Sequence, residues 1–137
     1  MQEKIKELCN KFGIADLYVF GSRAQEIASR IRGESGECQF PLSDVDIGIR
    51  TRKGIILTLE EQVKLAIELE DLLGVARVDL LNLVEVDPFL ALDIIRGELL
   101  YSENPDKQAE HELYILRRAG DLVYFKKQQI RQILKPS

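Results

Sequence analysis

Two short stretches of the sequence combine residue types that can do chemistry. The first, VFGSRAQ at residues 19–25, places Gly21 and Ser22 directly after an apolar run. Glycine tolerates the backbone angles of a sharp turn, and the start of a following helix offers unpaired N–H donors and a positive dipole end. Phosphate binds well in such a turn, and Arg23 could pair with its oxygens. Gly-Ser also occurs at such turns for capping alone, and Arg23 could equally be a solvated surface residue.

The second stretch, SDVDIGI at residues 43–49, aligns two carboxylates. Residues i and i+2 of a strand project from the same face, so Asp44 and Asp46 are expected to stand side by side. Like charges so close are unfavourable unless a cation lies between them or one carboxyl takes up a proton. Asp79 adds a third carboxyl within the apolar run ARVDLLNLV, where an unpaired charge is costly. A lone Asp-x-Asp also occurs as a solubilising or edge-protecting pair, but the three elements in this order favour a metal site.

The chemistry that these residues predict is metal-assisted phosphoryl or nucleotidyl transfer. Hard divalent ions that prefer oxygen ligands, Mg²⁺ above all, suit a set of three carboxylates. Two such ions can clamp the attacking and leaving oxygens of an in-line displacement. Gly21 and Ser22 would then hold the triphosphate of a nucleotide.

Hydrophobic spacing predicts the elements that position these residues. Helices are expected at 2–12, from Ser22 as N-cap to about Ile31, from Thr58 as N-cap to Gly74, and after Asp87 as N-cap. Strands are expected at 15–20, 44–49, 76–84 and 98–101. The run at 76–84 is almost continuously apolar, so we expect that strand to be buried on both faces. The pattern predicts an α+β (or α/β) domain with a small mixed sheet flanked by helices and a C-terminal helical tail.

The tail at 105–135 is expected to be one long helix or two helices joined near Gly120. The apolar residues expected to form its core stripe are Leu113, Leu116, Leu122 and Val123. The only histidine, His111, is expected to be an exposed side chain without a catalytic role. The tyrosines, expected to be packing residues, are Tyr18, Tyr101, Tyr114 and Tyr124, and the two cysteines, expected to be ordinary thiols, are Cys9 and Cys38.

Length and charge limit the classes of function. The chain has 137 residues, which fits one domain with a real core, and no apolar run approaches the length of a membrane helix. No signal peptide is recognisable, so we expect a cytoplasmic protein without a membrane partner. The net charge of −4 argues against a general nucleic-acid binder. The charge is unevenly distributed. From Asp106 onward seven Lys/Arg face four acids, a net charge of +3, so the preceding 105 residues carry a net charge of −7.

The motifs resemble a known family. Gly21-Ser22-Arg23-Ala24, Asp44-Val45-Asp46 and Val78-Asp79-Leu80 resemble the signature of the DNA polymerase β-like minimal nucleotidyltransferases, the MNT group. The stretch DPFLALDIIRGELLYSENP and the tail resemble the C-terminal part of MNT antitoxins paired with HEPN toxins. The resemblance thus spans nearly the whole chain. It implies a minimal nucleotidyltransferase domain at 1–104 and a helical extension of the same domain at 105–137.

The resemblance also implies a site and an activity. Asp44, Asp46 and Asp79 would be the ligands of two Mg²⁺ ions, with Asp79 also placed to help activate the attacking hydroxyl. Gly21, Ser22 and Arg23 would bind the nucleotide. The implied reaction is transfer of AMP from ATP to a tyrosine of a cognate HEPN ribonuclease toxin, which silences the toxin. No direct contact with nucleic acid is expected, and a homodimer is the oligomer considered.

Two alternatives to this activity stay open. The first is a binding antitoxin that silences the toxin by contact alone and uses its site only to sense nucleotide. The second is a nucleotidyltransferase that acts on a small molecule such as an aminoglycoside, although 137 residues leave little room for a second substrate-binding domain.

The spacing between the motifs departs from the family's pattern. The common pattern is Gly-Ser-x(10)-Asp-x-Asp, whereas 21 residues separate Ser22 from Asp44 here. The extra stretch, about 32–42, is predicted to form a longer loop beside the site, where it would shape acceptor specificity or cover the site.

Overall fold

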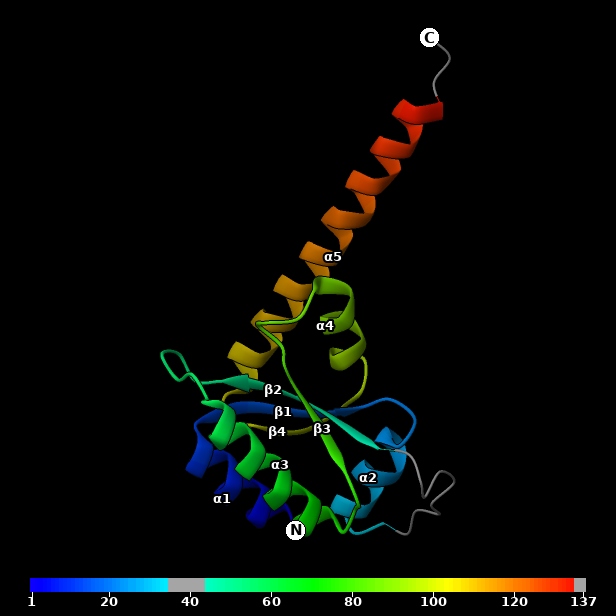
Figure 1. Ribbon diagram of the computed structural model, residues 1–137. Coiled ribbons are helices and arrows are strands. Elements are labelled where there is room, and N and C mark those ends of the chain that lie inside the picture. The colour runs from blue at the N-terminus through cyan, green and yellow to red at the C-terminus, as the bar shows by residue number, and fades with distance from the viewer. Residues whose placement is uncertain (35–43, 135–137) are drawn as a thin grey trace.

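The computed structural model describes residues 1–34 and 44–134 and contains a four-stranded sheet with helices on both faces (Figure 1). The elements in chain order are α1 (Gln2–Phe12), β1 (Ile14–Phe20), α2 (Ala24–Ile31), β2 (Val45–Thr51), α3 (Leu59–Leu73), β3 (Val78–Asn82), α4 (Pro88–Ile95), β4 (Glu98–Ser102) and α5 (Pro105–Leu134). The expected number and order of elements are confirmed. Cys38 and most of the 32–42 stretch lie outside the described residues.

The sheet is mixed, as predicted. Its strand order is β3-β2-β1-β4, with β1 antiparallel to both of its neighbours and β2 parallel to β3. In this register Asp46 lies opposite Phe20 of β1 on one side and opposite Asp79 of β3 on the other. Two motifs that are far apart in the sequence are therefore neighbours at one end of the sheet.

The two faces of the sheet form separate cores. Leu17, Val19 and Ile47 point to the face covered by α1, α2 and α3, where they join the larger core. Alternate residues such as Tyr18 point to the opposite face, where they pack with Ile94 of α4 and with α5. Because side chains alternate along a strand, β2 presents Asp46, Gly48 and Arg50 to this second face.

Helix α4 covers only the middle of the second face. Ile94 is fully buried against Gly48, so closely that a Cβ at Gly48 would collide with its γ2 methyl group. Asp46 precedes this contact along β2 and Arg50 follows it. The carboxylates at one end of the face are therefore left uncovered by α4.

Helix boundaries follow the expected caps, with one exception. Thr58 and Glu61 form a reciprocal capping box at α3, Gly74 ends that helix in the left-handed conformation, and Asp87 accepts hydrogen bonds from two backbone N–H groups of α4. The prediction of Ser22 as N-cap of α2 is wrong. Helix α2 begins at Ala24, because residues 21–24 first form a turn in which the Ala24 N–H donates to the Gly21 carbonyl.

The third strand is shorter and less buried than expected. It spans Val78–Asn82 rather than 76–84, and only Val78 is fully buried. The prediction of burial on both faces is wrong because β3 lies at the edge of the sheet and pairs only with β2. The edge position leaves the side chain of Asp79 partly exposed.

Helix α5 is a single helix of 30 residues that continues through Gly120 and extends well beyond the body of the domain (Figure 1). The predicted core stripe is wrong. Its buried residues are Ile115 and Ala119, whereas Leu113, Leu116 and Val123 are exposed and Leu122 is half-buried. The reason is that α4 has only eight residues and covers only one side of the long helix.

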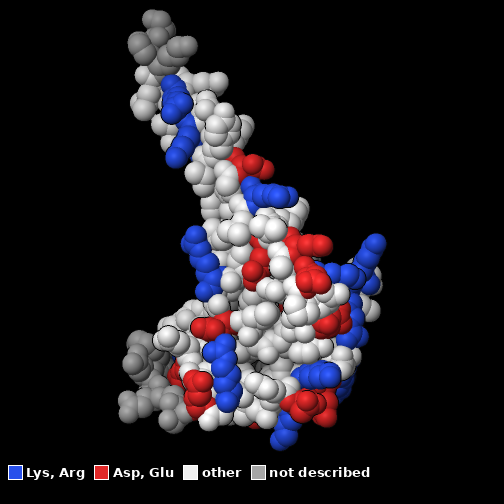
Figure 2. All heavy atoms as spheres, turned by 180° about the vertical axis from the view of Figure 1, so that it is seen from behind, with Lys and Arg blue, Asp and Glu red and all other residues white. Residues whose placement is uncertain are grey.

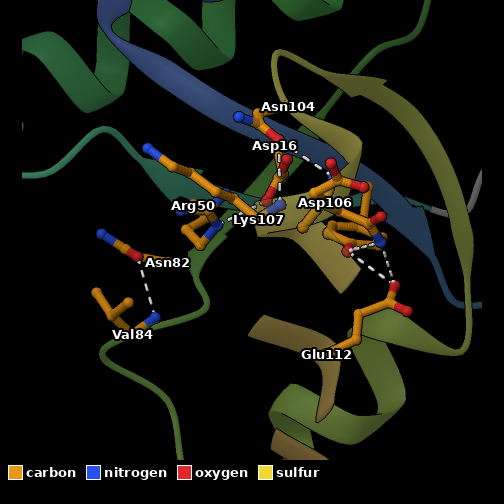
Figure 3. A network of polar contacts seen from close by, with 10 residues as sticks. Asp16, Arg50, Asn82, Val84, Asn104, Asp106, Lys107 and Glu112 are labelled. Atoms are coloured by element: carbon orange, nitrogen blue, oxygen red, sulfur yellow. Dashed lines mark hydrogen bonds and ion pairs between the residues drawn. The ribbon is translucent and has the colours of Figure 1, made fainter. Parts of the chain in front are cut away.

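Polar contacts attach the first turns of α5 to the sheet (Figure 3). The side-chain oxygen of Asn104 accepts from the N–H groups of Asp106 and Lys107. The Tyr18 hydroxyl donates to Glu112 at 2.9 Å, and the Gln108 amide donates to the same hydroxyl at 3.0 Å. Because Tyr18 lies in the central strand, this bonding fixes the direction in which α5 leaves the body.

A buried ion pair lies at the same end of the sheet (Figure 3). The Nε atom of Arg50 lies 2.6 Å from Oδ2 of Asp16, which is fully buried. His111 is half-buried beside this pair, and burial, followed by the positive charge of Arg50, lowers its pKa. The expectation of an exposed His111 is therefore wrong, because the first half of α5 packs on the body.

The predictions for the tyrosines and for Cys9 can be compared with their burial in the structure. Tyr18 is a packing residue as predicted, but Tyr114 and Tyr124 are more than half exposed on α5. Burial raises the pKa of the Cys9 thiol to about 12, so this cysteine is an unreactive core residue. In the described part of the chain, no helix is both long and apolar enough to span a bilayer.

The close contact between Gly48 and Ile94 predicts that adding one methyl group at position 48 lowers the stability of the fold. We expect Gly48→Ala to destabilise the fold by about 1–3 kcal/mol, because α4 must shift away from the sheet. The matched control is Gly120→Ala, since a Cβ at Gly120 meets open space within a helix and should add about 0.5–1 kcal/mol. Chemical denaturation of both variants measures the difference, and equal midpoints would contradict the tight α4 contact.

Candidate functional site

Three aspartates lie near one another at one end of the second face. Asp46 of β2 and Asp79 of β3 are direct partners in the parallel ladder, and Asp44 precedes Asp46 by two residues on the same side. The side chains of Asp44 and Asp79 are each 42% exposed, whereas Asp46 is half-buried between the neighbouring strands. The structure thus brings together the aspartates that the sequence singled out.

The negative charges of the three carboxylates act on one another. Burial, followed by the charges of Asp79 and Asp44, raises the pKa of Asp46. The folded chain therefore holds the charged form of Asp46 less well than the unfolded chain does. A cation among the three carboxylates would reverse this effect, because it favours the charged form.

A guanidinium group lies between two of the carboxylates. The Nε atom of Arg77 lies 3.3 Å from Oδ1 of Asp79 and 3.8 Å from Oδ2 of Asp44. Because the Arg77 side chain is 69% exposed, such ion pairs contribute only about 0–1 kcal/mol, and a stronger cation can replace them. Arg77 was not among the residues singled out from the sequence, although its position two residues before Asp79 is a signal that could have identified it.

The Gly-Ser turn lies against one of these carboxylates, that of Asp46. Gly21 has a positive φ of 81°, and a Cβ at this position would lie 2.5 Å from Oδ2 of Asp46. Glycine is therefore needed both for the backbone angle and for the approach of the carboxylate. Gly21 and Ser22 are both exposed, so their backbone is accessible to a ligand beside Asp46.

Arg23 is buried rather than exposed to solvent. Its side chain is buried and forms a two-pronged ion pair with Glu26, at 3.2 and 2.8 Å, and Arg30 contacts the same carboxylate at 2.7 Å. The alternative of a solvated surface arginine is wrong, because the i,i+3 pair draws the guanidinium against α2. Its contact with a nucleotide stays a prediction.

The three carboxylates are the kind of ligand that a hard divalent cation prefers, but their side chains are not arranged around a common point in this structure. Within residues 1–34 and 44–134, no three His, Cys, Asp or Glu side chains already converge on a point that could hold a metal ion. The donors available at this end of the face are carboxylate oxygens, which Mg²⁺ prefers, and the pKa of Asp46 is raised by its neighbours. Asp44 and Asp79 would have to turn away from Arg77 to join Asp46 around an ion.

An open cavity of about 320 Å³ lies on the other side of the turn. Its lining comes from the turn and the start of α2 on one side and from the end of α4 and the start of β4 on the other: Gly21, Ser22, Ala24, Gln25, Asp93, Arg96, Gly97 and Glu98. The end of α4 was not among the candidate site residues predicted from the sequence. The Gly-Ser turn therefore has the carboxylates on one side and a hollow on the other.

Solved structures with the same fold come from toxin-antitoxin complexes. A chain of a MntA-HpeT toxin-antitoxin mutant, which carries two Asp-to-Glu changes two positions apart, aligns with a TM-score of 0.69 and 18% identity over 98% of this chain and 99% of that one. A toxin-antitoxin structure with AMP-PNP aligns with a TM-score of 0.65 and 18% identity over 98% of both chains.

A third similar structure contains a tri-AMPylated Shewanella oneidensis HEPN toxin in complex with an MNT antitoxin. The TM-score is 0.64 and the identity 18%, over 98% of this chain and 96% of the other. These likenesses confirm the nucleotidyltransferase fold. No curated protein matches the chain.

The sequence itself matches a family model. The model described as "Polymerase beta, Nucleotidyltransferase" matches residues 3–106, a span that includes the Gly-Ser turn and the three aspartates. Since this match covers most of the chain, the protein belongs to the polymerase β nucleotidyltransferase family.

Proposed function

We propose that the protein is an antitoxin that transfers AMP from ATP to a tyrosine of a cognate HEPN ribonuclease toxin and thereby neutralises it. The observation that carries this proposal is the pairing of Asp46 with Asp79 directly beside the Gly21 turn. Family membership supports nucleotidyl transfer. The similar structures with AMP-PNP and with an AMPylated HEPN toxin support the choice of nucleotide, reaction and partner.

The residues of the site have distinct roles in this proposal. Asp44, Asp46 and Asp79 would hold two Mg²⁺ ions, which when bound would neutralise phosphate charge and clamp the attacking and leaving oxygens. Gly21 and Ser22 offer backbone close to the phosphates without a side chain at Gly21 that would obstruct Asp46. Arg77 neutralises Asp44 and Asp79 when no nucleotide is bound, and its exposure allows it to leave.

The transfer itself needs a proton acceptor. The oxygen of the toxin's tyrosine forms a bond to the α-phosphorus of ATP, while the bond from that phosphorus to the bridging oxygen of pyrophosphate breaks. A free tyrosine has a pKa near 10, so its proton must pass to a base as the bond forms. Asp79 is partly exposed at the sheet edge, and we assign it this role.

The projecting half of α5 supports a protein partner. Leu116, Val123, Ile130 and Leu134 recur at spacings of seven, seven and four residues, which places them on one side of the helix, and we call them the α5 stripe. All four are exposed large apolar residues. A monomeric soluble protein rarely leaves such a continuous apolar surface uncovered, so the stripe indicates an interface.

Charge along the same helix indicates what kind of surface covers the stripe. Residues 117–134 contain five Lys/Arg against the single acid Asp121, a net charge of +4, and Figure 2 shows basic side chains along the projecting helix. Two such segments would repel each other, so pairing of α5 with a second α5 is disfavoured. The partner surface is expected to combine apolar residues with acidic ones.

The catalytic part of the proposal predicts loss of AMP transfer when a carboxylate is neutralised. Asp44→Asn and Asp46→Asn should each lower the rate by at least about 100-fold, since a ligand should matter no less than the groups that orient it. The measurement is transfer of label from ATP carrying ³²P in the α-phosphate to the HEPN toxin, with Mg²⁺. The matched control is Asp71→Asn on the exposed side of α3. A wild type that binds and silences the toxin without labelling it would establish the binding-antitoxin alternative instead.

The raised pKa of Asp46 predicts that this residue costs stability. Since its charged form is held less well in the folded chain, Asp46→Asn should raise Tm at neutral pH without metal, by about 1–3 °C. Adding Mg²⁺ should stabilise the wild type and not the variant. Thermal unfolding followed by circular dichroism gives both comparisons, and a variant less stable than the metal-free wild type would contradict the repulsion among the three carboxylates.

If the α5 stripe is the interface with the HEPN toxin, a single charged residue placed in it should weaken binding of the toxin. Ile130→Glu should raise the Kd for the HEPN toxin by at least about 10-fold, because it places a charge in an apolar contact. Gln132→Glu, on the other side of the helix, is the control with the same charge change and should bind like the wild type. Calorimetry measures both, and equal binding by the two variants would exclude the stripe. If ultracentrifugation instead finds a wild-type dimer that Ile130→Glu dissociates, the stripe binds a second copy.

A further inference from the structure

Arg96 stands out among the residues that line the cavity beside the Gly-Ser turn. It is the C-cap of α4 and is exposed, and among the residues that the structure describes it forms no ion pair. Arg32 differs in this respect, because it pairs with Glu98 of the cavity lining at 3.2 Å. Arg96 therefore brings to the cavity a positive charge that is not held in an ion pair with any carboxylate of the described residues.

The sheet places Arg96 across the turn from the carboxylates. The strand order runs from Asp79 on β3 through Asp46 on β2 to Phe20 on β1, and β4 follows on the far side. Gly97 packs so closely on the end of β1 that a Cβ there would collide with Phe20 and with the Val19 carbonyl oxygen. Since neighbouring strands lie about 4.8 Å apart, β2 and β4 are separated by roughly 10 Å at this end.

This separation matches the needs of a nucleotide whose α-phosphate lies at the carboxylates. The phosphate chain of such a nucleotide would cross the exposed backbone of Gly21 and Ser22, and its β- and γ-phosphates would reach the cavity. The cavity volume of about 320 Å³ is large enough for these two groups. Among the described residues that line it, two are acids: Glu98 is paired with Arg32, and Asp93 is an exposed residue on α4.

We propose that Arg96 binds the β- and γ-phosphates of ATP, the part of the nucleotide that leaves as pyrophosphate. The inference rests on the proposed function and adds a contact residue that lies outside its Gly-Ser and aspartate motifs. When the bond between the α-phosphorus and the bridging oxygen breaks, negative charge accumulates on the departing pyrophosphate. A guanidinium held beside that oxygen stabilises this charge and can contact two phosphate oxygens at once.

The test compares nucleotides with and without these phosphates. Calorimetry with Mg²⁺ should give Arg96→Ala a Kd for ATP about 10- to 100-fold higher than that of the wild type, and an unchanged Kd for AMP. Arg96→Lys should recover part of the loss, because it restores the charge without the planar fork. Arg117→Ala, an exposed arginine on α5, is the control for removal of a positive charge. Circular dichroism establishes that each variant is folded.

The outcomes separate the inference from the proposed function. If the wild type binds ATP and Arg96→Ala binds it equally well, the role of Arg96 is excluded and the proposed transfer stands. If Arg96→Ala loses ATP and AMP to the same degree, the contact is not with the β- and γ-phosphates and the inference is wrong. If the wild type binds no ATP, both fail. Only a loss restricted to ATP supports the assignment.

Discussion

The candidate site depends on the in-register pairing of β2 with β3 and on the contact between Gly21 and Asp46. This pairing puts Asp46 beside Asp79, and the glycine turn brings the end of β1 against the same carboxylate. The arrangement is electrostatically unfavourable without a cation, as the raised pKa of Asp46 indicates. Two apolar cores on opposite faces of the sheet supply the stability that lets the fold retain it.

Contacts local in the sequence were predictable, and contacts set by the arrangement of elements were not. The Asp44 and Asp46 pair follows from strand alternation, and the ends of α3 and α4 follow from capping residues, because each depends on a few neighbouring positions. The edge position of β3 and the exposure of Leu116 depend on which strand lies alongside and how far α4 reaches. Arg96 was missed for the same reason, since it gains meaning only from the Gly-Ser turn across the cavity, whereas Arg77 was missed although its spacing to Asp79 is visible in the sequence.

The second face of the sheet serves two separate purposes. Its middle is packed, since Ile94 fills the space above Gly48, and the two ends are polar. One end holds the three carboxylates, and the other holds the ion pair of Asp16 with Arg50 next to the first turns of α5. Tyr18 lies between them and, through its hydrogen bond to Glu112, attaches α5 to the same strand that ends in the Gly-Ser turn. A single strand therefore supports both the nucleotide site and the helix that extends toward a partner.

The projecting half of α5 also has a consequence for how long the chain survives in a cell. Its hydrogen bonds lie in solvent and most of its large apolar residues are exposed, so this segment opens at little cost compared with the core. A protease acts on backbone that opens in this way. A partner seated on the helix would close this route by mass action, so an unbound copy of the protein would be degraded faster than a bound one. Turnover would then adjust the amount of the protein to the amount of its partner without any dedicated sensor.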